Sequence, residues 1–165
     1  MSQDTVMLEG ALADRSAWTA ERCTIDAALS VVSTRSAMLI LREAFYGTRR
    51  FDDFVERVGV TEAVAAARLR ELTDAGVLRR VPYQQPGQRT RHEYRLTQMG
   101  SDLFPALLAL ARWGDEYLTG EAGPPLQWLH HDCGAAVSAT VTCAAGHEVP
   151  IGELMVRGRR RPSSR

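Results

Sequence analysis

Residues 49–97, RRFDDFVERVGVTEAVAAARLRELTDAGVLRRVPYQQPGQRTRHEYRLT, carry the signals that decide the fold of this 165-residue chain. Four apolar side chains recur with the spacing of one face of a two-turn helix: Phe51, Phe54, Val55 and Val58. Gly59 ends that helix, and Thr61 is a good N-cap for a second helix that begins at Glu62. The stretch therefore opens with two short helices joined by a tight turn.

The second half of the stretch predicts the end of that second helix and a β-hairpin after it. One face of the helix is apolar and packs inward, at Ala65, Leu69 and Leu72. Gly76 stops the helix, and predicted strands at residues 77–81 and 92–96 flank the Pro-Gly loop QQPGQRT. Thr97 or Ser101 can start the next helix. Helix, turn, helix and hairpin in this order are the plan of a winged helix-turn-helix, so the expected fold class is mainly α (α+β).

With these elements the chain resembles the HxlR family of bacterial winged-helix regulators, relatives of the MarR type, over about residues 22–118. The resemblance rests on ordered blocks: RCTIDAALSVVSTR, SAMLILREAFYGTRRFDDF, ARLRELTDAGVLRR, HEYRLTQMG and LLALARWGDEY. It implies a homodimer that binds double-stranded DNA and represses or activates a nearby operon.

Composition and charge agree with a globular protein that carries a basic segment. The chain is 45% apolar and 24% charged, and its length suits one domain with a small addition. No run of about 18 apolar residues occurs, and residues 1–12 carry acids instead of a basic leader, so we expect a cytoplasmic protein without a membrane partner. The formal net charge is zero, yet residues 35–95 hold twelve Arg against eight acids.

Arginines at the start of the first helix and in the hairpin are the predicted phosphate contacts. Arg49 and Arg50 lie near the expected phosphate track, and residues 79–95 hold five Arg and one Glu. Arg91 matches the wing arginine of the family, whereas Arg89 is assigned from its place in the hairpin alone. The alternative for the hairpin charges is a solvated surface loop.

The second helix would enter the major groove, but it carries few side chains that read bases. Residues 61–67 read TEAVAAA, where family members usually have polar and basic residues. The candidate contacts on this helix are Thr61, Ala63, Ala67, Arg68 and Arg70. Specificity would then fall on the arginines and on sequence-dependent DNA shape. The alternative for the two arginines is ion pairing along the helix with Glu71 and Asp74.

Helices on either side of the helix-turn-helix predict a dimer interface. In residues 24–34 one face is apolar, at Ile25, Ala28, Leu29 and Val32. Residues 101–118 carry two adjacent apolar stripes, and a helix that is apolar over more than one face needs a partner. Residues 36–46 supply core, at Met38, Leu39, Leu41, Ala44 and Phe45. We therefore expect the first and last helices to pair two subunits.

Cys23 stands just before the first of these helices. In some family members a cysteine at this point senses oxidants or electrophiles, and the unpaired amides of a helix N-terminus favour the reactive thiolate. The alternative is a small buried hydrophobe near the dimer interface. A small apolar ligand between the dimerisation helices and the wing domain is a second candidate signal.

The last part of the chain predicts a small β appendage with metal ligands. Residues 121–125 are a linker, and residues 127–156 predict three short strands. The spacing His-x2-Cys and Cys-x3-His in His130, Cys133, Cys143 and His147 suits a tetrahedral structural zinc. Some family relatives carry a zinc-ribbon-like extension whose second knuckle is Cys-x2-Cys, so His147 would replace a cysteine. A metal-free ribbon or a Cys133–Cys143 contact is the alternative.

The predicted organisation is a tail at residues 1–21, the winged domain with its dimerisation helices at 22–119, the appendage at 120–156 and a basic tail at 157–165. Two functions fit it. One is a sequence-specific, homodimeric DNA-binding regulator that responds to an effector. The other is a ligand-binding or protein-interaction module with weak or no DNA binding. An enzyme is not expected, because no nucleophile has a base at motif spacing.

Overall fold

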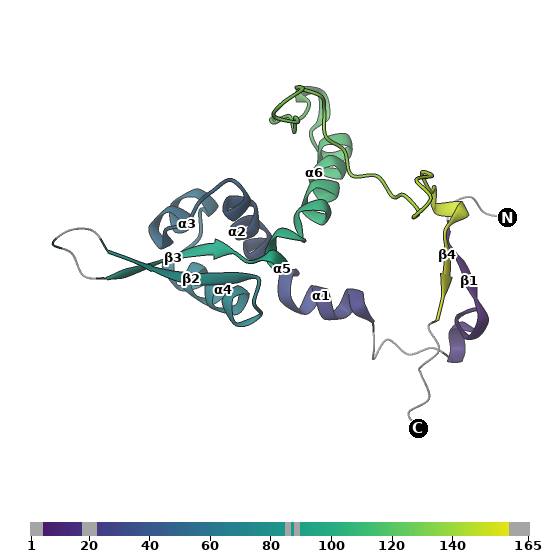
Figure 1. Ribbon diagram of the computed structural model, residues 1–165, viewed down its shortest axis with the longest axis horizontal. Coiled ribbons are helices and arrows are strands. Elements are labelled where there is room, and N and C mark those ends of the chain that lie inside the picture. The colour runs from purple at the N-terminus through teal and green to yellow at the C-terminus, as the bar shows by residue number, and fades with distance from the viewer. Residues whose placement is uncertain (1–4, 18–22, 85–86, 88–89, 159–165) are drawn as a thin grey trace. The chain divides into compact units, whose positions relative to one another are not determined.

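The computed structural model describes residues 5–17, 23–84, 87 and 90–158, and it divides the chain into two units. The larger unit, Thr24–Ala139, contains α1 (Thr24–Val32), α2 (Arg35–Phe45), α3 (Phe51–Val58), α4 (Glu62–Asp74), β2 (Leu78–Tyr83), β3 (Arg91–Leu96), α5 (Gln98–Ser101), α6 (Phe104–Leu118) and the 3-10 helix η4 (Gly120–Ala122) (Figure 1). The smaller unit joins Met1–Cys23 to Thr140–Arg165 and contains β1 (Met7–Glu9), η1 (Gly10–Leu12), η2 (Arg15–Ala17), η5 (Ile151–Glu153) and β4 (Met155–Arg157).

Helices α3 and α4 form the helix-turn-helix that the sequence predicts. Helix α3 buries Phe54 and Val58, and Gly59 ends it with a φ of 68°, a left-handed conformation that glycine adopts without strain. The Thr61 hydroxyl then accepts a hydrogen bond from the backbone N–H of Val64 at 3.3 Å and caps α4. Both helices and the predicted N-cap are confirmed.

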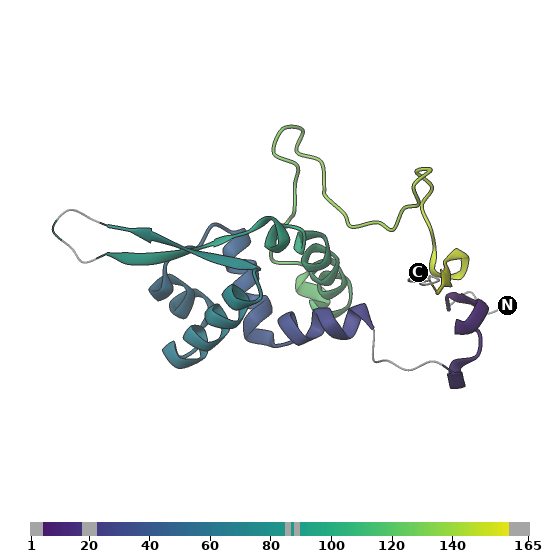
Figure 2. The same ribbon diagram turned by 60° about the horizontal axis from the view of Figure 1, so that its bottom comes forward.

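Strands β2 and β3 form an antiparallel wing, in register from Leu78 opposite Leu96 to Tyr83 opposite Arg91. Figures 1 and 2 show these strands extending beyond α3 and α4. At the base of the wing, the backbone N–H of Thr97 donates to the carbonyl of Val77 at 3.1 Å, and the Thr97 side chain caps α5. The predicted hairpin and the helix start after Thr97 are confirmed.

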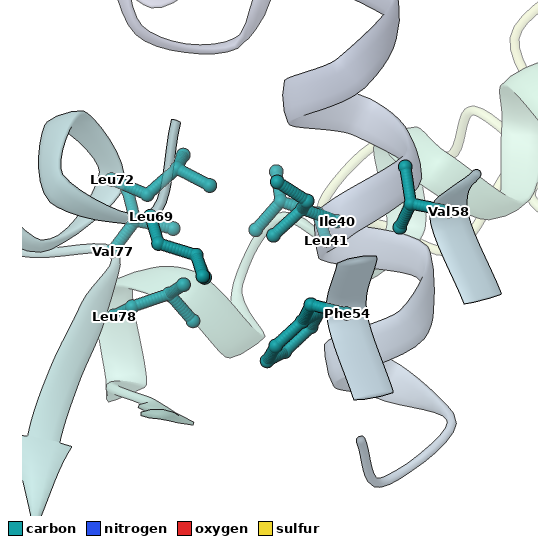
Figure 3. Close-up of a cluster of buried hydrophobic side chains, with 8 residues drawn as sticks. All are labelled: Ile40, Leu41, Phe54, Val58, Leu69, Leu72, Val77 and Leu78. Atoms are coloured by element: carbon teal, nitrogen blue, oxygen red, sulfur yellow. The ribbon is translucent and has the colours of Figure 1, made fainter. Parts of the chain in front are cut away.

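The core of the larger unit consists of side chains from α2, α3, α4 and the chain leading into the wing (Figure 3): Ile40, Leu41, Phe54, Val58, Leu69, Leu72, Val77 and Leu78. Of the core residues expected on α2, Leu41 is buried and the other four are only partly buried. Ile40 is fully buried and was not predicted. The difference arises because α2 contacts α3, α4, β3 and α6, so neighbours cover more than one of its faces.

Helices α1 and α6 leave apolar side chains uncovered. Helix α1 has no buried residue, and Ile25 is 68% exposed. Helix α6 buries Leu107 and Leu108, but Trp113 and Leu118 are 53% and 70% exposed. Within the part of the chain that the structure describes, no single helix is long and apolar enough to cross a membrane, and α1 with α2 reaches that length only as a pair bent by 79°.

The C-terminal part of the chain is mostly irregular. Where the sequence predicts three short strands, the described residues contain two isolated bridges, Leu129–Ala136 and Thr142–Glu148, and the strand β4. The bridged segments make too few cross-strand hydrogen bonds to extend into ladders. Strand β4 pairs in parallel with β1, a strand that the sequence analysis did not predict, and Arg157 Nε lies 2.6 Å from a carboxylate oxygen of Glu9.

Candidate nucleic-acid interface

Two exposed arginines lie in the link between α2 and α3. The backbone N–H of Tyr94 in β3 donates to the carbonyl oxygen of Arg49 at 2.8 Å, which ties this link to the wing. Arg50 is the N-cap residue of α3, and its guanidinium carbon lies 5.3 Å from the centre of the Tyr83 ring in a cation–π contact. The structure therefore holds both predicted phosphate contacts beside the hairpin.

A hollow of about 380 Å³ lies where α3 begins beside the hairpin. It is lined by basic and aromatic side chains and by a single acid: Arg50, Arg80, Arg91, His92, Phe51, Tyr83, Tyr94 and Asp52. Among the residues that the structure describes, no carboxylate forms an ion pair with any of the three arginines. Three guanidinium groups without carboxylate partners around one hollow can bind an anion such as a phosphate.

Arg80 and His92 belong to this hollow, although the sequence analysis did not assign them. The excess of arginine in residues 79–95 was the available signal, but it could not choose among the arginines. The hairpin register distinguishes the arginines, because it sets Arg80 opposite Tyr94, which also lines the hollow. The neighbouring Arg79 does not line the hollow. Arg89, also predicted as a contact, lies outside the described residues.

The recognition helix α4 presents mostly small side chains. Thr61, Ala63 and Arg70 are exposed, and Ala67 and Arg68 are partly exposed. Arg68 pairs with the carboxylate of Glu71, one turn further along the helix, so the ion-pairing alternative describes this residue. Arg70 has no ion pair within the described ranges and lines, with Arg80, a second hollow of about 270 Å³. Arg70 is thus a cation of this helix that has no ion pair in the described chain and shares a hollow with the hairpin.

A buried carboxylate orders the link that carries Arg49 and Arg50. Glu43 of α2 is only 6% exposed, and the guanidinium of Arg42 donates to its Oε1 at 2.7 and 3.1 Å. The Thr48 hydroxyl donates to Glu43 Oε2 at 3.3 Å and accepts from Arg57 of α3 at 2.9 Å. The buried charge is therefore paired with Arg42, as a buried carboxylate requires, and Thr48 connects it to Arg57 of α3.

The three cysteines of the chain, Cys23, Cys133 and Cys143, are free thiols. Cys23 is partly exposed and directly precedes α1, and its sensor role stays a prediction. Backbone hydrogen bonds, first from His147 and then from Ala145, lower the pKa of the exposed Cys143 thiol, because they stabilise the thiolate.

The four predicted zinc ligands fall into two pairs. His130 Nδ1 lies 3.2 Å from Cys133 Sγ in the larger unit, and the backbone N–H of Cys143 donates to the carbonyl of His147 at 2.9 Å in the smaller one. Across the described parts of the chain, no group of three or more His, Cys, Asp or Glu side chains is arranged to hold a metal ion. Each pair has the chemistry of half a tetrahedral site, and structural zinc stays a prediction.

Helices α3 and α4 together with the wing define a winged helix-turn-helix, and the hollow with its three arginines suits the class of proteins that bind nucleic acid. The profile of the HxlR-like helix-turn-helix family matches residues 31–122. An uncharacterized HTH-type transcriptional regulator of Mycobacterium tuberculosis is 42% identical over 127 residues, which make up 76% of this chain and 79% of that relative. The chain belongs to the HxlR-like helix-turn-helix family.

Solved structures agree with this family. The crystal structure of PA1607, a candidate transcription factor, matches with a TM-score of 0.74 at 33% identity, covering 82% of this chain and 94% of that one. The redox regulator HypR in its oxidized form matches with a TM-score of 0.52 at 27% identity, covering 57% of this chain and 96% of that one. The protein is a DNA-binding transcriptional regulator of the helix-turn-helix type and not an enzyme.

Proposed function

We propose that this regulator binds double-stranded operator DNA as a homodimer in the cytoplasm. The hollow between α3 and the hairpin takes the phosphate backbone, and α4 enters the major groove. The observation that carries the proposal is the convergence of Arg50, Arg80 and Arg91 on one hollow without carboxylate partners in the described chain. Such contacts set the register of a protein on the duplex, whereas contacts to base edges supply the specificity.

The apolar faces of α1 and α6 support the homodimer. Ile25 and Leu29 of α1 are exposed, as are Trp113, Tyr117 and Leu118 of α6, and none of them fills the core of its own unit. Exposed apolar faces of this kind mark protein–protein interfaces. A two-fold axis through them would present two hairpins to one duplex, as two half-sites about one DNA turn apart require.

Specificity in this proposal comes from few contacts. The exposed face of α4 offers the methyl groups of Ala63 and Ala67, which can touch thymine methyls, and the guanidinium of Arg70, which can reach guanine. The remaining discrimination would come from DNA shape and deformability. We therefore expect tolerance of base changes at many operator positions.

Two signals remain candidates for control of DNA binding. One is oxidation of Cys23, which lies partly exposed directly before α1. The match to a redox regulator supports this signal. The other is a small apolar ligand held beside α6. Structural zinc at His130, Cys133, Cys143 and His147 would be a separate, stabilising cofactor.

A second function has an observation of its own. The exposed alanines of α4 and the ion pair between Arg68 and Glu71 leave the recognition helix with a single arginine, Arg70, that has no ion pair within the described residues. A winged-helix ligand-binding or protein-interaction module with weak or no DNA binding would have such a helix.

Binding to the protein's own upstream DNA tests the proposal. Arg50→Ala, Arg80→Ala and Arg91→Ala should each weaken binding by about tenfold or more, because a charge-assisted contact is lost. Arg79→Ala is the matched control: it removes the same charge from the same strand, outside the hollow. Unchanged affinity in all three variants, or no specific binding by the wild type at low salt, would favour the module over the regulator.

A further inference from the structure

A cavity of about 350 Å³ lies between α2 and α6, away from the arginine hollow. Its walls are mainly carbon, from side chains such as Met38 and Leu39 of α2 and Leu107 and Leu110 of α6. Every lining residue belongs to the unit Thr24–Ala139, so the cavity is complete within that unit. Its volume and lining suit a small organic ligand.

Aromatic packing holds the outer wall of the cavity in place. Trp128, which follows α6 in the chain, has its ring centre 5.8 Å from that of Tyr46 and 5.8 Å from that of Phe104. The backbone N–H of Val137 donates to the Trp128 carbonyl at 2.8 Å, which also fixes this segment. The wall is therefore a packed feature, anchored to the end of α2 and to the start of α6.

Two charged side chains, Arg42 and Asp115, line the cavity, and only Arg42 has an ion-pair partner within the described residues. Arg42 donates two hydrogen bonds to Glu43, so its charge is already paired. Asp115 also lines the cavity and is partly buried, and its carboxylate has no hydrogen bond or ion pair within the described residues. An apolar cavity with one unpaired carboxylate is complementary to a ligand that joins an apolar ring to a positive charge.

We propose that this cavity binds small aromatic cations, with the ring against Trp128 and the ammonium group at Asp115. The role of this cavity as the effector site of the regulator rests on the proposed function. Binding of the ligand to the cavity does not depend on DNA binding and can be tested without DNA.

Calorimetric titration of the full chain without DNA tests the site. The probes are 1-naphthylmethylamine, 1-naphthylmethanol and 1-naphthoate, which share a ring system and differ in charge. At pH 7 the amine should bind about tenfold more tightly than the alcohol, and the carboxylate should bind most weakly. Asp115→Asn should remove the advantage of the amine and leave the affinity for the alcohol unchanged. Glu116→Gln, at the next and exposed position, should leave all three affinities unchanged.

The variant Gly114→Leu tests whether the ligand binds in the cavity. Gly114 lines it, and an added Cβ there meets nothing within 4 Å, so a larger side chain at this position is expected to occupy the cavity. This variant should keep its helical circular dichroism and lose binding of the amine and the alcohol. A separate gel shift with and without the amine measures any effect on DNA, so loss of DNA binding and loss of ligand binding are told apart.

Three results would overturn the proposal. The first is equal affinity for the amine and the alcohol in the wild type, and the second is undiminished binding in Gly114→Leu. The third is no binding of any probe at millimolar concentration to folded wild-type protein. If in that case Gly114→Leu also shifts the oligomeric state, a second copy of the chain covers the cavity instead.

Discussion

Replacing Arg50, Arg80 and Arg91 together by alanine changes the salt dependence of DNA binding by an amount that can be worked out. Each phosphate that a protein neutralises on B-DNA releases counterions and adds about −0.9 to the slope of log K against log salt concentration. The hollow offers three guanidinium groups per subunit, and a homodimer offers twice that number. The wild-type slope should therefore be steeper than that of the triple variant by about 5.4.

This difference is large enough to measure directly. Between 50 and 200 mM salt, the wild type should lose about a thousandfold more affinity than the triple variant, because log salt concentration changes by about 0.6. Fluorescence anisotropy of a labelled upstream duplex over a series of NaCl concentrations gives both slopes. Arg79→Ala, in the same strand but outside the hollow, should keep a slope close to that of the wild type.

The same slopes distinguish three ways in which the protein could contact DNA differently. A difference of about 2.7 would mean that only one subunit contacts DNA, which contradicts the proposed binding by both subunits of a homodimer. A difference near zero would remove the hollow from the interface. An equally large change in Arg79→Ala would show that the total charge of the hairpin matters and that the arrangement of its arginines does not.

Three further predictions concern stability and thiol reactivity. Gly100→Ala should lower the free energy of unfolding by about 1–3 kcal/mol in urea denaturation, because its Cβ would lie 2.2 Å from the Val77 oxygen, and a neutral result would contradict that contact. Gly114→Ala, in an open helical position, should raise stability by about 0.5–1 kcal/mol and serves as its control. Phe54→Ala should cost about 3–5 kcal/mol, because Phe54 is 0% exposed, and a loss below about 1 kcal/mol would argue against its core position. Cys143 should be alkylated by iodoacetamide at pH 8 faster in the folded protein than in protein unfolded in urea, since the backbone hydrogen bonds that lower its pKa leave more thiolate; equal rates by mass spectrometry would refute the shift.

The parts of the fold that follow from local sequence were predictable. The spacing of Phe51, Phe54 and Val58 specifies α3, and the Thr61 hydroxyl specifies the start of α4, because each signal acts within one or two turns. A glycine after each of these two helices then ends it with a positive φ. Helix, turn and hairpin could therefore be predicted without knowledge of the rest of the chain.

The parts that depend on distant segments were not predictable in the same way. Arg80 joins the hollow because the hairpin register sets it opposite Tyr94. Trp128 closes a cavity wall because it packs on Tyr46, and no periodicity in the sequence relates these two positions. The pairing of β1 with β4 joins the two ends of the described chain, and strands of three residues give almost no local signal.

The fold holds Arg50 on an ordered backbone, which supports the proposed phosphate contact. Its link is fixed at one end by the backbone N–H of Thr48, which donates to the Glu43 carbonyl at 2.9 Å, and at the other by the hydrogen bond from Tyr94 to Arg49. A guanidinium carried on an ordered backbone loses less conformational entropy when it binds than one on a free loop. The cost of burying Glu43 is offset by its own hydrogen bonds. The cation–π contact with Tyr83 then holds the Arg50 guanidinium beside the hairpin.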